Sequence, residues 1–110
     1  MEVNAFSPTG LTVSFTAATT APTSAQAVSS APATRPANRY RVVNAGTQVV
    51  LLGVGATDAA AKTAAASIGA GAVPVLPGAV EILGFPAGSY FSGVTATSTS
   101  VVYVTPGEGI

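Results

Sequence analysis

Few residues in this chain have side chains that could carry out acid–base or nucleophilic chemistry, and both histidine and cysteine are absent. Histidine is the usual general base, the usual partner in a catalytic triad and the commonest metal ligand. Without cysteine there is no disulfide, no thiolate ligand and no cysteine nucleophile. We therefore predict no catalytic residue, no cofactor-binding residue and no metal ligand, and we expect a protein that is not an enzyme.

The remaining ionisable residues have simpler explanations than catalysis. Lys62 would need a desolvated site to act in a Ser/Lys dyad, but it stands among the alanines of a predicted helix. A glycosidase needs two acids held ~5 to 10 Å apart across a cleft. Asp58 is better explained as a helix cap, Glu81 as the outward residue of a strand, and Glu2 and Glu108 lie near the termini. The four acids are also too scattered in the sequence for a calcium loop.

Two glycine-containing segments are similar to nucleotide-binding motifs but fail them. Residues 55–63 read as a turn that begins with glycine and leads into a helix carrying Lys-Thr, as in a phosphate-binding loop. That motif needs glycine directly before the lysine, where this chain has Ala61. Residues 53–55 lack the third glycine of a dinucleotide fingerprint. Turn glycines account for both segments.

The charged and aromatic residues argue against two further classes of partner. The basic cluster consists of Arg35, Arg39 and Arg41 alone, and the net charge of the chain is zero, so we expect no nucleic acid as a partner. A sugar-stacking platform uses exposed aromatic rings, often tryptophan, which this chain lacks. We expect most of its aromatic residues in the core or on strand faces, namely Tyr40, Tyr90, Tyr103, Phe6, Phe15, Phe85 and Phe91.

The composition is typical of a protein that works by contact. The chain has 110 residues, about one domain, and is 48% hydrophobic but only 7% charged, against ~25% in ordinary soluble domains. Its surface must therefore consist largely of Ser, Thr, Gly and Ala, and a net charge near zero favours association. The apolar stretches are too short for a membrane helix, so we expect no membrane partner. The start of the chain lacks a secretory pattern, so we expect the protein to stay where it is made.

The hydrophobic pattern predicts an all-β protein. Residues 11–16 alternate with period two, which places Leu11, Val13 and Phe15 on one face of a strand. Short strands are also predicted at 73–76, 79–83, 90–96 and 99–105, separated by turn residues. The candidates for inward side chains are Val75, Val80, Ile82, Phe91, Val94, Val102 and Val104. Short strands at this spacing predict a jelly-roll-like or Greek-key β-sandwich.

Residues 40–68 add a predicted hairpin and a helix. Two aliphatic runs, 40–44 and 48–55, flank the turn residues 45–47 and predict a β-hairpin. Residues 49–52 are consecutively aliphatic, so we expect both faces to be covered, one by the core and the other by another sheet or chain. Residues 58–68 predict one short alanine-rich helix in a loop, lying on the sheet, with Thr57 or Asp58 as N-cap and Gly69 as stop.

Residues 17–38 are rich in Pro, Ser, Thr and Ala and contain little that could pack. They predict an extended arm or mobile loop within a single domain of residues 1–110. Two alternatives remain: plain disorder, or an arm that becomes ordered only on a neighbouring subunit.

Several segments between Arg39 and Ile110 resemble known virion proteins. They are 40–47 (YRVVNAGT), 74–78 (PVLPG), 80–82 (VEI) and 102–109 (VYVTPGEG). In these the chain resembles the small capsid decoration, or cement, proteins of short-tailed bacteriophages. The resemblance implies a jelly-roll-like sandwich on the outside of the capsid, often a dimer, which clamps neighbouring major capsid subunits. It carries no motif of functional residues.

We therefore expect a non-enzymatic virion structural protein, made in the host cytoplasm and located on the outer capsid surface. Its expected partners are the major capsid protein and a second copy of itself, with residues 11–16 and 17–38 reaching a neighbouring subunit. The alternative is a receptor- or glycan-binding β-module of a phage tail or fibre, which would have much the same composition.

Overall fold

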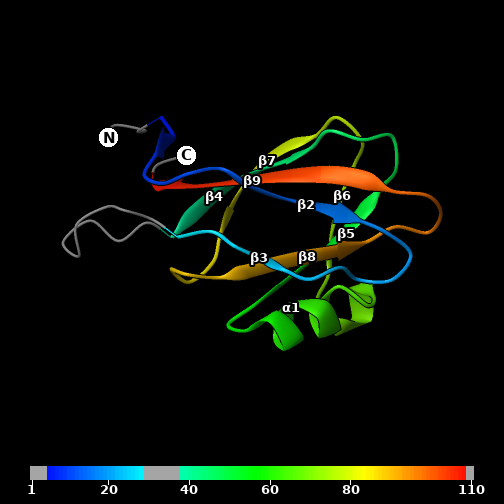
Figure 1. Cartoon of the computed structure of the whole chain (residues 1–110). Helices are drawn as coiled ribbons and strands as arrows, with labels where there is room; N and C mark the ends of the chain where they lie inside the picture. Colours follow the sequence, from blue (N-terminus) through cyan, green and yellow to red (C-terminus); the bar gives the residue numbers. More distant parts are fainter. Residues whose placement is uncertain (1–4, 29–37, 109–110) are drawn as a thin grey trace.

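The computed structural model describes residues 5–28 and 38–108. In it, two antiparallel β-sheets pack face to face, and one short helix lies outside them (Figure 1). The five-stranded sheet contains β1 (Ser7–Pro8), β2 (Val13–Ala17), β9 (Ser100–Glu108), β4 (Arg39–Asn44) and β7 (Val80–Gly84). The four-stranded sheet has the order β3 (Ala25–Gln26), β8 (Tyr90–Val94), β5 (Val50–Gly55) and β6 (Val73–Val75). The all-β sandwich predicted from the hydrophobic pattern is confirmed.

The strand order is that of a jelly roll. In the five-stranded sheet, β1 and β2 lie along one side of β9, and β4 and then β7 follow on its other side. Apart from β5 and β6, consecutive strands from β2 to β9 alternate between the two sheets. The orders β2-β9-β4-β7 and β3-β8-β5-β6 therefore correspond to the two interlocked Greek keys of a jelly roll.

The hairpin predicted from residues 40–55 is wrong, because its two strands belong to different sheets. Strand β4 pairs with β7 and β9, whereas β5 pairs with β6 and β8. The residues between them cross from one sheet to the other around the buried side chain of Asn44. A turn of Ala, Gly and Thr suits either connection, so the local sequence does not distinguish a hairpin from a crossover.

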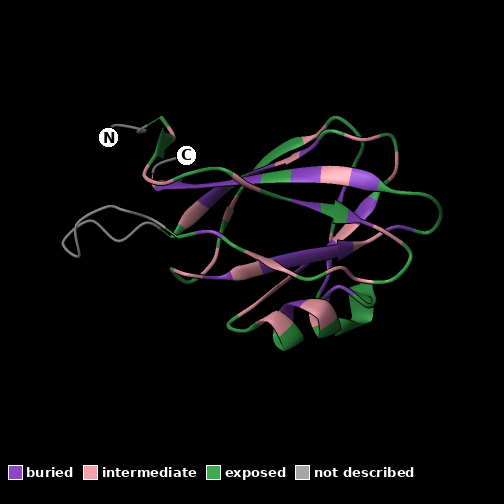
Figure 2. Cartoon of the chain, viewed as in Figure 1, coloured by how far each residue is buried: buried purple, intermediate pink, exposed green. Residues whose placement is uncertain are grey.

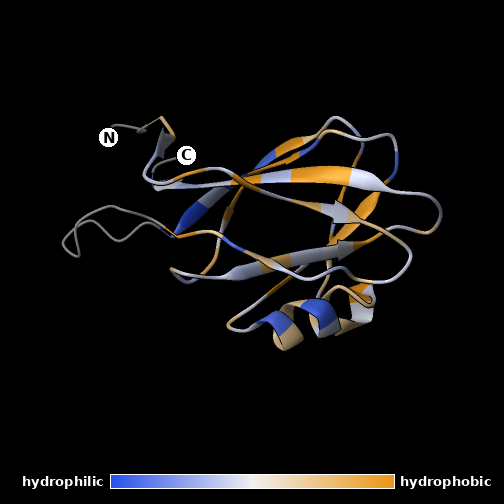
Figure 3. Cartoon of the chain, in the orientation of Figure 1, coloured by the Kyte–Doolittle hydropathy of each residue, from blue (hydrophilic) through white to orange (hydrophobic). Residues whose placement is uncertain are grey.

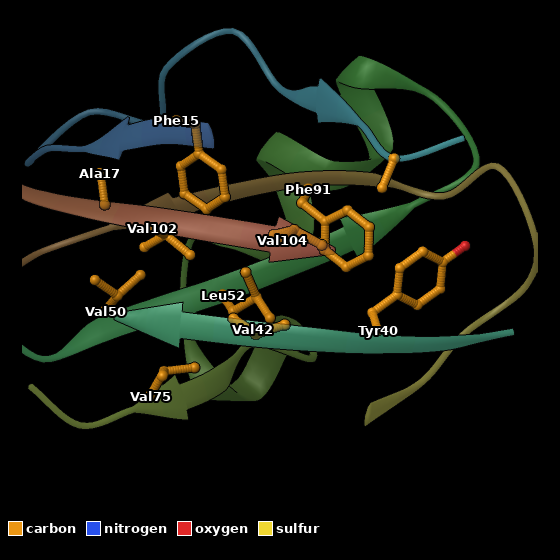
Figure 4. Packing of buried hydrophobic residues seen from close by; sticks show 11 residues of the cluster. Phe15, Ala17, Tyr40, Val42, Val50, Leu52, Val75, Phe91, Val102 and Val104 are labelled. Atoms are coloured by element: carbon orange, nitrogen blue, oxygen red, sulfur yellow. The ribbon is translucent and has the colours of Figure 1, made fainter. Parts of the chain in front are cut away.

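One cluster of buried side chains fills the space between the sheets (Figure 4). Both sheets contribute to it: Phe15, Ala17, Ala27, Tyr40, Val42, Val50, Leu52, Val75, Phe91, Val102 and Val104. Buried positions alternate with more exposed ones along β2 and β4, as the pleat requires, whereas β8 is buried over most of its length (Figure 2). Of the predicted inward residues, Val75, Phe91, Val102 and Val104 are buried and Val94 is half-buried.

Two hydrophobic residues predicted to point inward are exposed instead, and so is Leu11, which was predicted to share a strand face with Val13 and Phe15. Val80 and Ile82 are 59% and 37% exposed, because β7 places them on its outer side while Leu83 packs against the core. Leu11 lies before β2 begins and is 85% exposed, so only the later residues of the predicted 11–16 strand follow the expected pattern. Alternation marks two faces of a strand but does not say which one is inside.

Helix α1 (Asp58–Ala64) lies on the outer face of the four-stranded sheet, where the sequence predicted a short helix (Figure 1). It ends earlier than predicted and is followed by the 3₁₀ turn η1 (Ile68–Ala70). Helix α1 lies close against strand β5 because β5 has glycine at the contact. A Cβ on Gly53 would overlap the backbone of Ala61 and Ala65. The expected cover on both faces of residues 49–52 is therefore found only in part. Val50 and Leu52 face the core, but Leu51 is half-buried and Val49 is 43% exposed, and the helix covers the outer face of β5 further along, at Gly53 and Gly55.

Residues 17–28 are part of the sandwich, which corrects the predicted arm over this range. Ala17 and Ala27 are fully buried, and β3 pairs with β8. The Ser92 hydroxyl donates a hydrogen bond of 2.9 Å to the carbonyl of Pro22 and so ties the segment to the sheet. Small side chains, which suggested little packing, are what allow this segment to lie close to its neighbours. The rest of the predicted arm, 29–37, lies outside the described residues.

Candidate interaction surface

The ionisable residues of helix α1 are engaged in structural contacts. Lys62 Nζ lies 3.2 Å from Asp58 Oδ2, one turn away, and both side chains are partly exposed. Asp58 Oδ1 accepts hydrogen bonds of 2.6 Å from the Ser24 hydroxyl and 2.8 Å from the Ser24 backbone N–H. Those two bonds, together with Lys62, lower the pKa of Asp58 to about 2. Asp58 thus anchors residue 24 to the helix.

The helix cap is Thr57 and not Asp58. The Thr57 side chain accepts a hydrogen bond of 3.1 Å from the Ala60 N–H. Residues 55–63 do form a strand end, a turn and a helix, but Gly55 is packed against the helix, since a Cβ there would lie 2.6 Å from that of Ala60. This segment therefore offers no phosphate cradle, and its one glycine serves packing.

The other predicted acids are scattered in space as they are in sequence. Glu81 lies opposite Val42 and so faces the core side of β7, not outward as predicted, yet it is exposed because β7 is an edge strand. Glu108 ends β9, and Glu2 lies outside the described residues. Within 5–28 and 38–108, no group of three His, Cys, Asp or Glu residues could hold a metal ion. No helix in these ranges is long and apolar enough to cross a membrane.

The aromatic residues divide between the core and the surface. Tyr40, Phe85 and Phe91 form one cluster, with ring centroids 4.9 Å apart for Tyr40 and Phe91 and 5.9 Å apart for Phe85 and Phe91. Phe6 lies on the outer side of the five-stranded sheet beneath the guanidinium of Arg41, whose Cζ is 5.5 Å from the ring centroid. Tyr103 is 43% exposed on the same side. Arg35, the third member of the predicted basic cluster, lies outside the described residues.

We call the outer side of the five-stranded sheet the open face, defined by the outward residues Ser14, Thr16, Val101, Tyr103, Arg41, Val43, Val80 and Ile82. Strand register places Ser14, Tyr103, Val43 and Val80 in one row across four strands. Arg41 and Ile82 follow in the next row. The row thus combines an exposed tyrosine with exposed valine, and a contiguous apolar patch of this kind marks an interaction site more often than isolated exposed residues do.

The two sheets differ sharply in how their outer sides are covered. Helix α1 and the segment around Ser24 cover the four-stranded sheet, and Ser92 on that side is fully buried. Among the described residues, Phe6 and its neighbours cover one end of the open face, where a Cβ on Gly107 would meet the Phe6 ring. Strongly hydrophilic positions are visible on α1, among its alanines, and at the start of β4 (Figure 3). Among the described strand residues, Arg39 and Arg41 are the charged ones that point to the open face.

Two hollows occur away from the open face. A cavity of about 250 Å³ lies at the end of the sandwich and is lined mainly by small and apolar residues, among them Val54, Val73, Phe85 and Gly88. A wider groove of about 620 Å³ runs beside β2 and β3, between Pro8, Leu11, Val13 and Val28. Neither lining contains an ionisable side chain, so these hollows suit neutral apolar groups.

Comparisons with protein-family models, with curated proteins and with solved structures found no match to this chain.

The open face is the feature of the candidate site that the sequence did not reveal. Its signal was the alternation of Val80 and Ile82 in β7, which was assigned to the wrong side of the strand. Tyr103 was placed only generally, in the core or on a strand face.

Proposed function

We propose that this protein is a non-enzymatic structural protein of a bacteriophage virion. In this proposal it binds the outside of the capsid lattice and stabilises it by clamping neighbouring major capsid subunits. It is made in the host cytoplasm and acts on the outer capsid surface as a pair of identical chains. Its partners are the major capsid protein and its own second copy, and neither a cofactor nor a nucleic acid takes part.

The observation that carries this proposal is the open face. A surface with Tyr103, Val43 and Val80 in one row and two arginines as its charged residues loses little solvation energy when a protein covers it. A broad sheet surface of this kind suits contact with another protein better than it suits a small ligand. Burial of its apolar area would supply the driving force.

The fold and the sequence add independent support. Jelly rolls are frequent in viral capsid proteins, although a fold alone does not determine function. The segments YRVVNAGT, PVLPG and VYVTPGEG resemble capsid decoration proteins, and they fall on β4 with its crossover, on β6 with its following turn, and on β9. They therefore lie in the framework of the sandwich and not in the helix or the segment before Arg39.

The test is to mix the purified protein with undecorated phage heads and to measure bound copies per particle and the rupture temperature of the heads. We expect saturable binding at a copy number that matches the lattice, with a raised rupture temperature. Tyr103→Glu should weaken binding about tenfold or more, since it places a charge in the centre of the open face. Ala59→Glu is the matched control, because residue 59 is exposed on α1 behind the other sheet. Unchanged binding by Tyr103→Glu would show that the open face is not the docking surface.

A receptor- or glycan-binding module of a tail or fibre is the second candidate. The exposed ring of Tyr103, flanked by Ser14 and Val43 in the register of the sheet, could stack on a sugar with polar groups nearby. Copy number separates the two candidates: a decoration protein saturates the lattice, whereas a tail or fibre module is present in few copies. No binding to heads, together with binding to host cells or their glycans, would favour this second function.

A further inference from the structure

Exposed sheet edges invite pairing with another strand, and native proteins usually protect them. Two of the four edges of this sandwich, as far as the structure describes it, are protected because their strands are very short. β3 has two residues, and β6 has three with Pro74 in the middle. Along the β1–β2 edge, β1 ends at Pro8, and β2 presents the polar side chains of Ser14 and Thr16 on its outer side before the chain bridges to the other sheet at Ala18 and Val94.

The remaining edge, β7, is neither very short nor interrupted by proline, and its one charged residue is Glu81 on the core side of the strand. Strand β7 consists of five residues, VEILG, and β4 is its only strand neighbour among the described residues. It contains no proline and no lysine, and all its residues except Leu83 are exposed. Val, Ile and Leu make it strongly hydrophobic, and Val and Ile favour extended structure. We expect an edge strand with these properties to pair with a strand of another chain when the protein performs its function.

The hydrogen bonds to β4 show which backbone groups of β7 face outward. At its two ends, the Asn44 N–H donates to the Ala79 carbonyl at 3.1 Å and the Phe85 N–H donates to the Asn38 carbonyl at 3.0 Å. Because bonded and non-bonded pairs alternate along an antiparallel ladder, the odd-numbered residues from 79 to 85 point their backbone groups toward β4. Val80, Ile82 and Gly84 therefore point their N–H and C=O groups to the open edge.

We propose that two copies of the protein pair edge to edge through β7, antiparallel and with a twofold axis at Ile82. In this register Ile82 faces Ile82 of the second copy, and Val80 faces its Gly84. Each of these three residues then both donates and accepts a backbone hydrogen bond. The two five-stranded sheets become one continuous sheet.

The neighbouring registers are worse for identifiable reasons. A twofold axis at Glu81 sets two carboxylates directly against each other and leaves Gly84 opposite residue 78, outside the strand. An axis at Leu83 sets Val80 opposite Pro86, which has no N–H to donate. The Ile82 register instead places Glu81 opposite Leu83 of the second copy, so the two Glu81 carboxylates do not face each other. This self-complementarity favours a second copy of this chain over an unrelated strand.

The side chains fit the same register. Ile82 and Val80 lie on the open face, so pairing joins the open faces of the two copies into one broader surface. Gly84 has no side chain opposite Val80, and the space beside it is taken by the Arg39 guanidinium, since a Cβ there would lie 2.6 Å from Arg39 Nη1. The inference deepens the self-association in the proposed function, and it rests on that function only for its biological role.

The first test is a cysteine cross-link. No other thiol can react, because the natural chain has no cysteine. In Ile82→Cys the two Cα atoms would lie about 5.5 Å apart, within the range of a disulfide. Glu81→Cys is the matched control, because it faces Leu83 and its own copy lies diagonally, roughly 7 to 8 Å away. Thr16→Cys on β2 controls for chance collisions. Under mild oxidation of the free protein, we expect a disulfide-linked dimer for Ile82→Cys and little for the other two.

The second test is Ile82→Pro, studied by sedimentation equilibrium. Proline removes an N–H that points to the open edge and leaves the bonds to β4 in place, so the fold should survive. We expect the dimer dissociation constant to rise about tenfold or more. Val80→Lys should act in the same direction without any backbone change, whereas Thr16→Lys on the opposite edge should have no effect.

Three results would overturn the inference: a wild-type protein that is monomeric at every concentration reached, a Val80→Lys variant that dimerises like the wild type, or cross-linking of Glu81→Cys as fast as that of Ile82→Cys. Each concerns the free protein alone. Binding to phage heads is measured separately, so failure of this dimer would leave the capsid proposal standing.

Discussion

The hydroxyl of Ser100 donates a hydrogen bond of 2.6 Å to Oδ1 of Asn44 in the interior of the sandwich, across 56 positions of sequence. The same amide oxygen accepts from the Gly46 N–H at 3.1 Å, and Nδ2 donates to the carbonyls of Gln48 and Val75 at 2.7 and 3.0 Å. One buried amide thus satisfies all four of its hydrogen-bonding positions. It connects β9, the crossover after β4 and strand β6 of the opposite sheet.

Replacement of Asn44 should therefore be costly. Asn44→Ala leaves the buried Ser100 hydroxyl and the carbonyl of Val75 without their partner, and we expect a loss of about 2 to 4 kcal/mol in the free energy of unfolding. Urea denaturation of the free protein measures it. Gln48→Ala, which keeps the backbone carbonyl that Asn44 uses, should cost less than about 1 kcal/mol. Equal losses in the two variants would contradict a role specific to the Asn44 amide.

Helix α1 should depend on the absence of a side chain at residue 53. In Gly53→Ala the new Cβ meets the backbone of the helix, which cannot yield as the end of a flexible side chain would. We expect a loss of about 2 to 3 kcal/mol and faster hydrogen exchange in residues 58–64. Gly69→Ala is the control, since its Cβ would lie 3.7 Å from its nearest neighbour, Ser67 Oγ. A Gly53→Ala protein with the exchange rates of the wild type would show that the helix is not held by this contact.

The contact between Ser24 and Asp58 should be lost at low pH. Hydrogen bonds from Ser24, and next the charge of Lys62, lower the pKa of Asp58 from 3.8 to about 2 in the folded protein. A lowered carboxyl pKa stabilises the folded state above the unfolded pKa, and this contribution disappears as the pH falls from roughly 4 to 2. Ser24→Ala should raise the pKa of Asp58 toward its ordinary value, which NMR titration of the carboxyl carbon measures. An unchanged pKa in this variant would contradict the assignment to Ser24.

Tyr40 combines a packing role with a polar one, and two variants separate them. Its hydroxyl donates a hydrogen bond of 2.8 Å to the Pro86 carbonyl, which also accepts one from Ser89. Tyr40→Phe should therefore cost only about 0.5 to 1.5 kcal/mol. Tyr40→Ala removes a fully buried ring from the cluster with Phe91 and should cost about 3 to 5 kcal/mol. Thermal and urea unfolding should rank the variants in this order, and similar losses for both would mean that the hydroxyl dominates.

Local patterns predicted most of the elements because each depends on residues that are close in sequence. Alternation located β2, a short run after turn residues located β9, the alanine run located α1, and Thr57 was one of two predicted caps. The same patterns misplaced Val80 and Ile82, since a period of two does not identify the buried side. They also misjudged residues 17–28, because small side chains suit both a loose segment and a closely packed one.

By itself, the sequence determined the all-β class, the short helix and most of the buried residues of the later strands, because propensity and periodicity are local properties of the chain. It also determined the lack of histidine and cysteine chemistry. Only the tertiary structure decided that β4 and β5 separate into opposite sheets, that the segment before residue 29 joins the sandwich, and that β7 forms an exposed edge. Those outcomes depend on contacts such as Asn44 with Ser100 and Gly53 with Ala61. Such contacts form between residues that are distant in sequence, so no local pattern encodes them.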